Sequence, residues 1–244
     1  MLLSPEGHYV YWLDGRNEDP VTPPMKISVI VPAYNEEKLL GNLLTALGQQ
    51  TLEPDEIIIV DNNSTDHTAA IARSYGVQVV RCVRAGVGSA RQAGLEAATG
   101  DVILTTDADC LPQSTWVKHM ALALQEAIAV YGPLRFYGVP EADAWFSEYG
   151  YKAFLQISRL SRHPNLAGSN MGFHRKPALE VGGYPLSYTR EDVILGYKLM
   201  RRGQVKYVPD ALMLTSGRRL QDGWSRLLFK NFSDLFNKNP KAYR

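Results

Sequence analysis

The 244-residue sequence contains no run of eighteen apolar residues and only two cysteines, Cys82 and Cys110. The first absence argues against a membrane-spanning helix, and the second excludes a disulfide-stabilised scaffold and favours a reducing compartment. Residues 1–13 lack the basic flank of a signal peptide, so we expect a cytoplasmic location. The chain has no internal repeat, and 45% of its residues are hydrophobic. It can therefore bury a full core, which excludes disorder, collagen and coiled coil as global structures.

The net charge is only +1, but positive charge is concentrated near the C-terminus. Residues 201–244 hold ten Lys or Arg and three Asp, a net of +7, which leaves −6 on residues 1–200. A basic end favours an anionic partner, and a solvated helix face is the alternative. Residues 223–236 are basic and amphipathic, which is compatible with peripheral contact of residues 221–237 with the inner face of a membrane. The alternative is a C-terminal helix packed on the domain.

Short β-branched runs alternate with segments of helical periodicity. We expect strands at 26–31, 56–60, 77–82 and 102–105, and helices at 36–50, 65–75, 88–98 and 112–126, with Ser64 capping the second helix. This alternation predicts an α/β fold, Rossmann-like, with a mostly parallel sheet and helices on both faces. The second half is less regular, with helices expected at 142–160 and 193–201 and strands at 170–174, 205–208 and 212–215.

Polar segments follow the ends of the four expected strands. In a parallel α/β sheet, ligands bind outside the carboxyl ends of the strands, so these segments are where chemistry is expected. They are residues 32–36, 61–66, 84–88 and 107–109.

Asp107 and Asp109 provide the strongest local signal for a metal site. Two carboxylates one residue apart at the end of a buried strand can converge on Mg²⁺ or Mn²⁺, which prefer oxygen ligands and share sites with phosphates. One aspartate could instead bind a ribose hydroxyl. The alternative is that Asp109 stabilises the start of the following helix.

Three further segments have compositions typical of nucleotide binding. Asp61 follows a buried strand and suits a base or sugar hydrogen bond, with an Asx turn as the alternative. Tyr34 offers a flat face for a nucleobase, and Glu36 could simply be a first-turn acid. Residues 84–91 supply glycines and two cations near a helix start, which suits a diphosphate, with a glycine turn as the alternative.

Glu191 and Asp192 form a second acidic pair, at the start of an expected helix. Acids at that position are often partners of the helix dipole. They are also what a deprotonation step requires, one as general base and one to orient the acceptor. Thr215–Arg219 ends a strand with two cations, Arg218 and Arg219, and could close over a diphosphate.

Seven motifs in this order resemble family 2 glycosyltransferases of the GT-A fold, within the nucleotide-diphospho-sugar transferase superfamily. The resemblance covers about residues 26–219, and its pieces are residues 27–36, 59–66, 88–94, 100–109, 168–171, 182–184 and 191–192. It implies a single domain with an N-terminal extension (1–25), a nucleotide-sugar-binding half (26–127), an acceptor-binding half (128–219) and a basic helical tail (220–244).

The resemblance also implies a role for individual residues. Asp192 would be the general base, with Glu191 beside it, and Asp109 with Asp107 would bind Mg²⁺ or Mn²⁺. The nucleotide-sugar would contact Pro32, Ala33, Tyr34, Glu36, Asp61, Arg84, Gly88, Arg91, Asp107 and Ala108.

The implied activity is inverting, metal-dependent transfer of a sugar from a UDP- or GDP-linked donor to a hydroxyl of a saccharide or lipid-linked acceptor, in cell-envelope, polysaccharide or glycolipid synthesis (EC 2.4). No nucleic-acid partner is expected. Many relatives place a histidine or a Gln-x-x-Arg-Trp segment after the base, where this chain has Ser216–Arg219, so a histidine ligand and processive synthesis are disfavoured. The alternatives are a nucleotidyltransferase and a non-catalytic sugar-nucleotide-binding protein.

Overall fold

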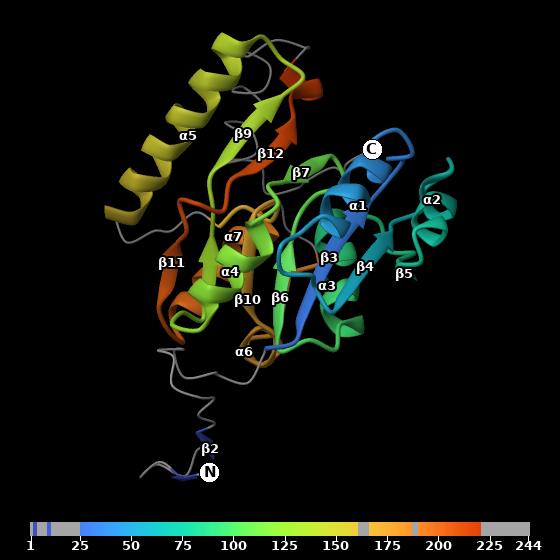
Figure 1. Ribbon diagram of the computed structural model, residues 1–244. Coiled ribbons are helices and arrows are strands. Elements are labelled where there is room, and N and C mark those ends of the chain that lie inside the picture. The colour runs from blue at the N-terminus through green and yellow to red at the C-terminus, as the bar shows by residue number, and fades with distance from the viewer. Residues whose placement is uncertain (1, 4–8, 11–24, 161–165, 187–189, 221–244) are drawn as a thin grey trace.

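The computed structural model describes residues 2–3, 9–10, 25–160, 166–186 and 190–220, and Figure 1 shows how their elements are arranged. The helices are α1 Leu40–Gly48, α2 Thr68–Ser74, α3 Val87–Ala97, α4 Trp116–Leu124, α5 Glu141–Leu160, α6 Arg175–Glu180, α7 Glu191–Met200 and the 3₁₀ turn η1 Gly217–Leu220. The strands are β1 Leu2–Leu3, β2 Tyr9–Val10, β3 Ile27–Ala33, β4 Glu56–Asp61, β5 Gln78–Arg81, β6 Val102–Thr105, β7 Cys110–Pro112, β8 Ala129–Tyr131, β9 Leu134–Tyr137, β10 Met171–His174, β11 Val205–Tyr207 and β12 Met213–Ser216.

A seven-stranded sheet forms the centre of the fold, in the order β11-β8-β10-β6-β3-β4-β5. Strands β6, β3, β4 and β5 are parallel, and β10 runs antiparallel to both β6 and β8. The predicted mostly parallel α/β sheet is therefore confirmed. Consecutive strands of the first half are joined through helices, as parallel pairing requires.

Helices cover both faces of this sheet because the side chains of β3 alternate between two cores. Val29 and Val31 pack with α1, α2 and α4, whereas Ile30 packs with α3, α6 and α7. All three side chains are fully buried, as expected for a central strand covered on both faces. None of the helices in the described ranges has the length and apolar character that a bilayer-spanning segment needs.

A small second sheet, β7-β12-β9, rises beside the first and packs against the long helix α5 (Figure 1). It was only partly predicted, because β7 and β9 are short and follow closely on other elements. Strand β7 lies between Asp109 and α4, so α4 begins at Trp116 rather than near 112. Asp109 is therefore not at a helix start.

Ser64 is not the cap of α2, which begins at Thr68 after His67. The oxygen Oδ1 of Asp66 instead accepts a hydrogen bond from the backbone nitrogen of Thr68 at 2.9 Å. Strand β8 and helix α6 were not predicted. The amphipathic segment 223–236 lies outside the described residues, and so does the membrane contact predicted for 221–237.

Asn170 holds the two sheets together. Its Nδ2 donates to the carbonyls of Pro133 and Ala211, each at 2.8 Å, and its Oδ1 accepts from Nε1 of Trp116 at 2.8 Å. The side chains of Asn170 and Trp116 are completely buried, so their polar atoms are hydrogen-bonded to protein groups instead of water.

We predict that Asn170→Ala lowers the free energy of unfolding by about 3 kcal/mol, because the Trp116 indole N–H and the Ala211 carbonyl lose the Asn170 amide, and the Pro133 carbonyl keeps only its bond from the Met213 nitrogen. Urea unfolding followed by circular dichroism measures the change. Asn42→Ala, at an exposed position of α1, is the matched control and should change stability by less than about 0.5 kcal/mol. A similar, small effect of both substitutions would contradict the role of Asn170.

Candidate active site

The ends of β3 and β4 place the predicted nucleoside residues side by side. Ala33 and Asp61 are register partners at the last position of their strands. Ala33 is buried, Pro32 is half-buried, and the next residue, Tyr34, exposes 45% of its surface. An exposed aromatic ring at the carboxyl edge of the sheet can stack on a nucleobase.

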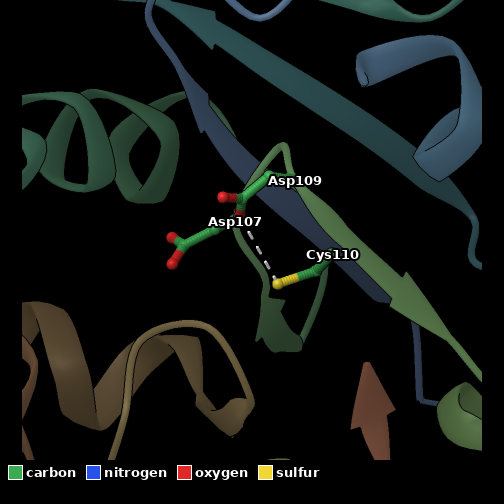
Figure 2. Close-up of side chains that lie close together, drawn as sticks. All are labelled: Asp107, Asp109 and Cys110. Carbon is green, nitrogen blue, oxygen red and sulfur yellow. Dashed lines mark hydrogen bonds between the residues drawn. The ribbon is translucent and has the colours of Figure 1, made fainter. Parts of the chain in front are cut away.

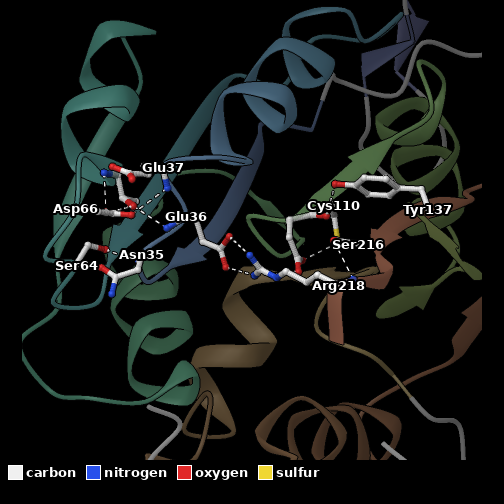
Figure 3. A network of polar contacts seen from close by, with 11 residues as sticks. Asn35, Glu36, Glu37, Ser64, Asp66, Cys110, Tyr137, Ser216 and Arg218 are labelled. Atoms are coloured by element: carbon white, nitrogen blue, oxygen red, sulfur yellow. Dashed lines mark hydrogen bonds and ion pairs between the residues drawn. The ribbon is translucent and has the colours of Figure 1, made fainter. Parts of the chain in front are cut away.

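Polar contacts fix the loop after β3 against the loop after β4 (Figure 3). Asn35 adopts a left-handed backbone with φ of 54°, and its Oδ1 accepts from the backbone nitrogen of Thr65 at 2.8 Å. In return, Ser64 Oγ accepts from the Asn35 nitrogen at 3.1 Å. The Asp61 carboxylate accepts from the Ser64 nitrogen at 3.1 Å, so it takes part in the local turn that its sequence also indicated.

Asn62 connects the same edge to the loop after β5. Its Nδ2 donates to the carbonyls of Cys82 at 2.9 Å and Arg84 at 2.8 Å, and its Oδ1 accepts from the Gly86 nitrogen at 2.9 Å. The backbone of Arg84 is therefore fixed, while its side chain is exposed. This arrangement leaves the guanidinium of Arg84 accessible to a ligand.

Arg91 is the buried centre of the site. From α3, it forms ion pairs with Asp107, at 2.7 Å, and with Glu191 at the start of α7. Its side chain is 5% exposed, as is that of Glu191, whereas Asp107 remains 38% exposed. The cation therefore joins an acid that faces outward to one that is enclosed.

Burial and charge act in opposite directions on this group. Burial lowers the pKa of Arg91, but the charges of Asp107 and Glu191 outweigh it and raise that pKa above its usual value. Burial also raises the pKa of Glu191, against the opposing effect of Arg91. The charge of Arg91 therefore offsets part of the cost of burying the Glu191 carboxylate.

Asp192 lies next to this group and is partly accessible. Its Oδ2 accepts from the backbone nitrogen of Gly168 at 2.7 Å, and its Oδ1 from that of Val193 at 2.8 Å. Gly168 packs against Arg91 so closely that a Cβ would come within 2.3 Å of the guanidinium carbon. Gly88 likewise lies against Glu191, where a Cβ would meet its Cγ at 3.2 Å. A side chain at position 168 would therefore displace the Arg91 guanidinium, and one at position 88 would press on Glu191 and on the Pro185 carbonyl.

Asp107, Asp109 and Cys110 form the one metal-competent group found within the described ranges (Figure 2). Their ligand atoms lie within 4.8 Å of one another. Burial raises the pKa of the Cys110 thiol, helped by the two aspartates, so the sulfur stays protonated and is a poor ligand. Two carboxylates remain, and this hard oxygen donor set fits Mg²⁺ or Mn²⁺.

Arg218 connects the metal-competent group to the nucleoside edge (Figure 3). Its guanidinium binds the Glu36 carboxylate through both terminal nitrogens, and its Nη2 lies 3.2 Å from Oδ2 of Asp109. The Tyr137 hydroxyl donates to the Asp109 carbonyl at 3.1 Å. Burial, and then the charge of Asp109, raise the pKa of Tyr137, which therefore remains a neutral donor.

A sequence profile of Glycosyl transferase family 2 matches residues 28–182. The chain belongs to this family. The match includes the strand ends and the Asp107–Asp109 segment described above, and it ends before Glu191 and Asp192.

Individual relatives agree with this membership. The chain is 34% identical, over 136 residues, to undecaprenyl-phosphate 4-deoxy-4-formamido-L-arabinose transferase of Serratia proteamaculans, which covers 52% of this chain and 41% of that protein. It spans between 41% and 63% of the length of the first three curated relatives that it matches.

Solved structures share the fold. A mannosyltransferase from Pyrobaculum calidifontis, in complex with GDP-Man and Mn²⁺, superposes with a TM-score of 0.66 at 23% identity, covering 91% of this chain and 67% of that one. Glucosyl-3-phosphoglycerate synthase from Mycobacterium tuberculosis, in complex with Mn²⁺, UDP and phosphoglyceric acid, gives 0.61 at 23% identity, covering 89% and 80%. Together with the sheet order, these similarities confirm the GT-A fold.

The structure thus brings Glu191, Asp107, Gly88 and Arg91 into direct contact, with Asp192 beside them. Asp109 and Glu36 meet through Arg218, and Asp61 and Arg84 lie along the same edge of the sheet. The direct ligand contact expected of Arg91 stays a prediction, and its burial indicates a positioning role. Asn62 and Tyr137 were not singled out in the sequence, because their partners lie in loops distant in the sequence and no local pattern marks them.

We predict that Arg91→Gln lowers the free energy of unfolding by about 3–5 kcal/mol at pH 8. Without the cation, the folded-state pKa of Glu191 rises further above its unfolded value. The protonated acid then costs little at low pH, and stability falls as the pH rises through the folded-state pKa. The loss at pH 5 should therefore be clearly smaller than at pH 8.

Denaturant titration at both pH values measures this difference. Lys206→Gln, which removes an ion pair with the exposed Glu126, is the control and should show little effect at either pH. An equal loss at pH 5 and pH 8 for Arg91→Gln would contradict the pairing of Arg91 with ionised Glu191.

Proposed function

We propose that this protein is a metal-dependent, inverting glycosyltransferase that moves a sugar from a UDP- or GDP-linked donor to an acceptor hydroxyl (EC 2.4). The observation that carries the proposal is the single acidic cluster at the carboxyl edge of the sheet. There, Arg91 joins Asp107 to Glu191, and Asp192 lies alongside. Family membership and GDP-Man or UDP in two structural neighbours support the donor class.

The nucleoside would bind at the loops after β3, β4 and β5. Tyr34 provides an exposed ring, and Asp61 a carboxylate with one oxygen engaged by the Ser64 nitrogen. Arg84 offers an exposed cation on a fixed backbone for the diphosphate. Pro32 and Ala33 would form the floor of the nucleoside site, because they are the last two residues of β3 and are half-buried and buried, respectively.

Asp109 and Asp107 would hold Mg²⁺ or Mn²⁺. When bound, the ion neutralises negative charge on the diphosphate leaving group. Both structural neighbours described above were solved with Mn²⁺, which supports an ion of this kind. Asp107 is also held by Arg91, so its direction is fixed before any ligand arrives.

Asp192 would act as general base. Two backbone nitrogens, those of Gly168 and Val193, orient its carboxylate, and its partial exposure admits an acceptor. It would accept the proton of the acceptor hydroxyl while that oxygen attacks the anomeric carbon from the side opposite the diphosphate. This displacement inverts the anomeric centre. Glu191, enclosed and paired with Arg91, would position Asp192 rather than react.

The acceptor would be a saccharide or a lipid-linked molecule of the cell envelope. The Serratia relative is named for undecaprenyl phosphate, which supports a lipid-linked acceptor. The basic C-terminal residues 221–237 would supply the peripheral contact with anionic lipid.

We expect Asp192→Asn to keep donor affinity but to lose turnover by about 10²–10⁴-fold, because the amide cannot accept the proton. Calorimetry with UDP, GDP and their sugars measures binding, and release of nucleoside diphosphate measures turnover. Asp210→Asn, at an exposed position, is the control and should match the native chain. Near-native turnover of Asp192→Asn would remove it from the role of base.

Asp109→Asn should weaken donor binding in the presence of Mn²⁺ by about tenfold or more, since an amide is a poorer ligand than a carboxylate. Without Mn²⁺, the variant should bind no more weakly than the native chain. Calorimetric titration of UDP and GDP with and without Mn²⁺ makes the comparison, with the exposed Glu53→Gln as control. An unchanged response to Mn²⁺ would exclude Asp109 as a ligand.

A further inference from the structure

Arg218 forms an ion pair with the carboxylate of Asp109, which the proposed function assigns to the metal. It lies in η1, directly after β12, and its Nη2 is 3.2 Å from Oδ2 of Asp109. The same guanidinium forms a two-point ion pair with Glu36 from the loop after β3. Arg218 thus joins Glu36, in the loop after β3, to Asp109, next to β7.

The Arg218 ion pairs are more exposed to solvent than the Arg91–Glu191 pair. The Arg218 side chain is 38% exposed, and those of Glu36 and Asp109 are 13% and 11% exposed. The Arg91–Glu191 pair exposes 5% on each side. Water reaches the Arg218 pair from the cation's side and screens it more than a buried pair, so its cation is easier to replace than Arg91.

We propose that Arg218 is an internal counter-ion that holds Asp109 in the donor-free protein, competes with the divalent cation for it, and binds the donor diphosphate after release. The inference rests on the proposed function and names the residue that controls entry to its site. The hydrogen bond and charge of Glu36 raise the pKa of Arg218, which therefore remains a cation throughout.

The two roles of Arg218 make opposite predictions for two ligands. While Arg218 is paired with Asp109, it must be displaced before Mn²⁺ binds, so removing it should tighten the binding of Mn²⁺ alone. Once released, its planar fork matches phosphate oxygens, so removing it should weaken the binding of a nucleoside diphosphate. A residue that only stabilised the fold would move both affinities in the same direction.

The test uses the full chain and titrates Mn²⁺ alone by electron paramagnetic resonance, which counts free ion. We expect Arg218→Ala to bind Mn²⁺ about fivefold tighter than the native chain, the factor that a half-exposed ion pair of about 1 kcal/mol gives. Calorimetry with UDP and GDP at saturating Mn²⁺ should show about tenfold weaker binding. Arg202→Ala, which removes an exposed contact with Glu180, is the control and should change neither.

Arg218→Lys keeps the charge but loses the fork, and serves if the alanine variant does not fold. It should shift both affinities in the same senses as Arg218→Ala, by smaller factors. If the Arg218 variants bind Mn²⁺ equally or more weakly than the native chain, Arg218 does not compete with the ion. The proposed function would still stand in that case, provided that the native chain binds Mn²⁺ and UDP or GDP. If the native chain binds neither Mn²⁺ nor any nucleoside diphosphate, the proposed function fails together with this inference.

Discussion

The buried guanidinium of Arg91 is the contact on which the site depends. It binds Asp107, at the end of the central sheet, and Glu191, at the start of α7, which are 84 residues apart in the sequence. Glu191 is enclosed, and burying an acid is costly unless a cation lies against it. Gly168 and Gly88 make room for that arrangement, since a Cβ on either would enter it. The metal-competent pair and the candidate base are thereby held in one place before any ligand binds.

Two cations divide the work at this edge of the sheet. Arg91 is enclosed and fixed, so it sets the directions of Asp107 and Glu191. Arg218 is half-exposed and shared between Glu36 and Asp109, so it can be exchanged for other positive charge. In the proposed site, Arg91 would supply the rigid frame that preorganises the acids, and Arg218 the counter-ion that a divalent cation replaces. The small β7-β12-β9 sheet carries both Asp109, next to β7, and Arg218, just after β12, and Asn170 fastens it to the main sheet.

Much of the fold could be predicted because strand and helix periods are local properties. The strands β3, β4 and β6 are apolar and β-branched, and their ends mark the polar segments of the site without any tertiary information. Strands β7 and β9 escaped prediction because each follows directly on another strand and so breaks the alternation of strand and helix, and β8 was missed with them. The acidic residues of the site could be predicted because several of them follow strand ends. The ion pairs that they form with arginines could not. That Arg91 would be buried, or that Arg218 would reach Glu36 across 182 residues, depends on packing that no local pattern contains.

The central claim is that the acids held by Arg91 and Arg218 form one site for a divalent ion and a diphosphate. A crystal of the full chain grown with Mn²⁺ and UDP or GDP, with anomalous scattering recorded for manganese, tests it most directly. The account predicts one strong anomalous peak bonded to the Asp109 carboxylate and to diphosphate oxygens, with Arg91 still bound to Asp107 and Glu191. A peak elsewhere, or a nucleotide bound away from the ends of β3 and β4, would contradict it.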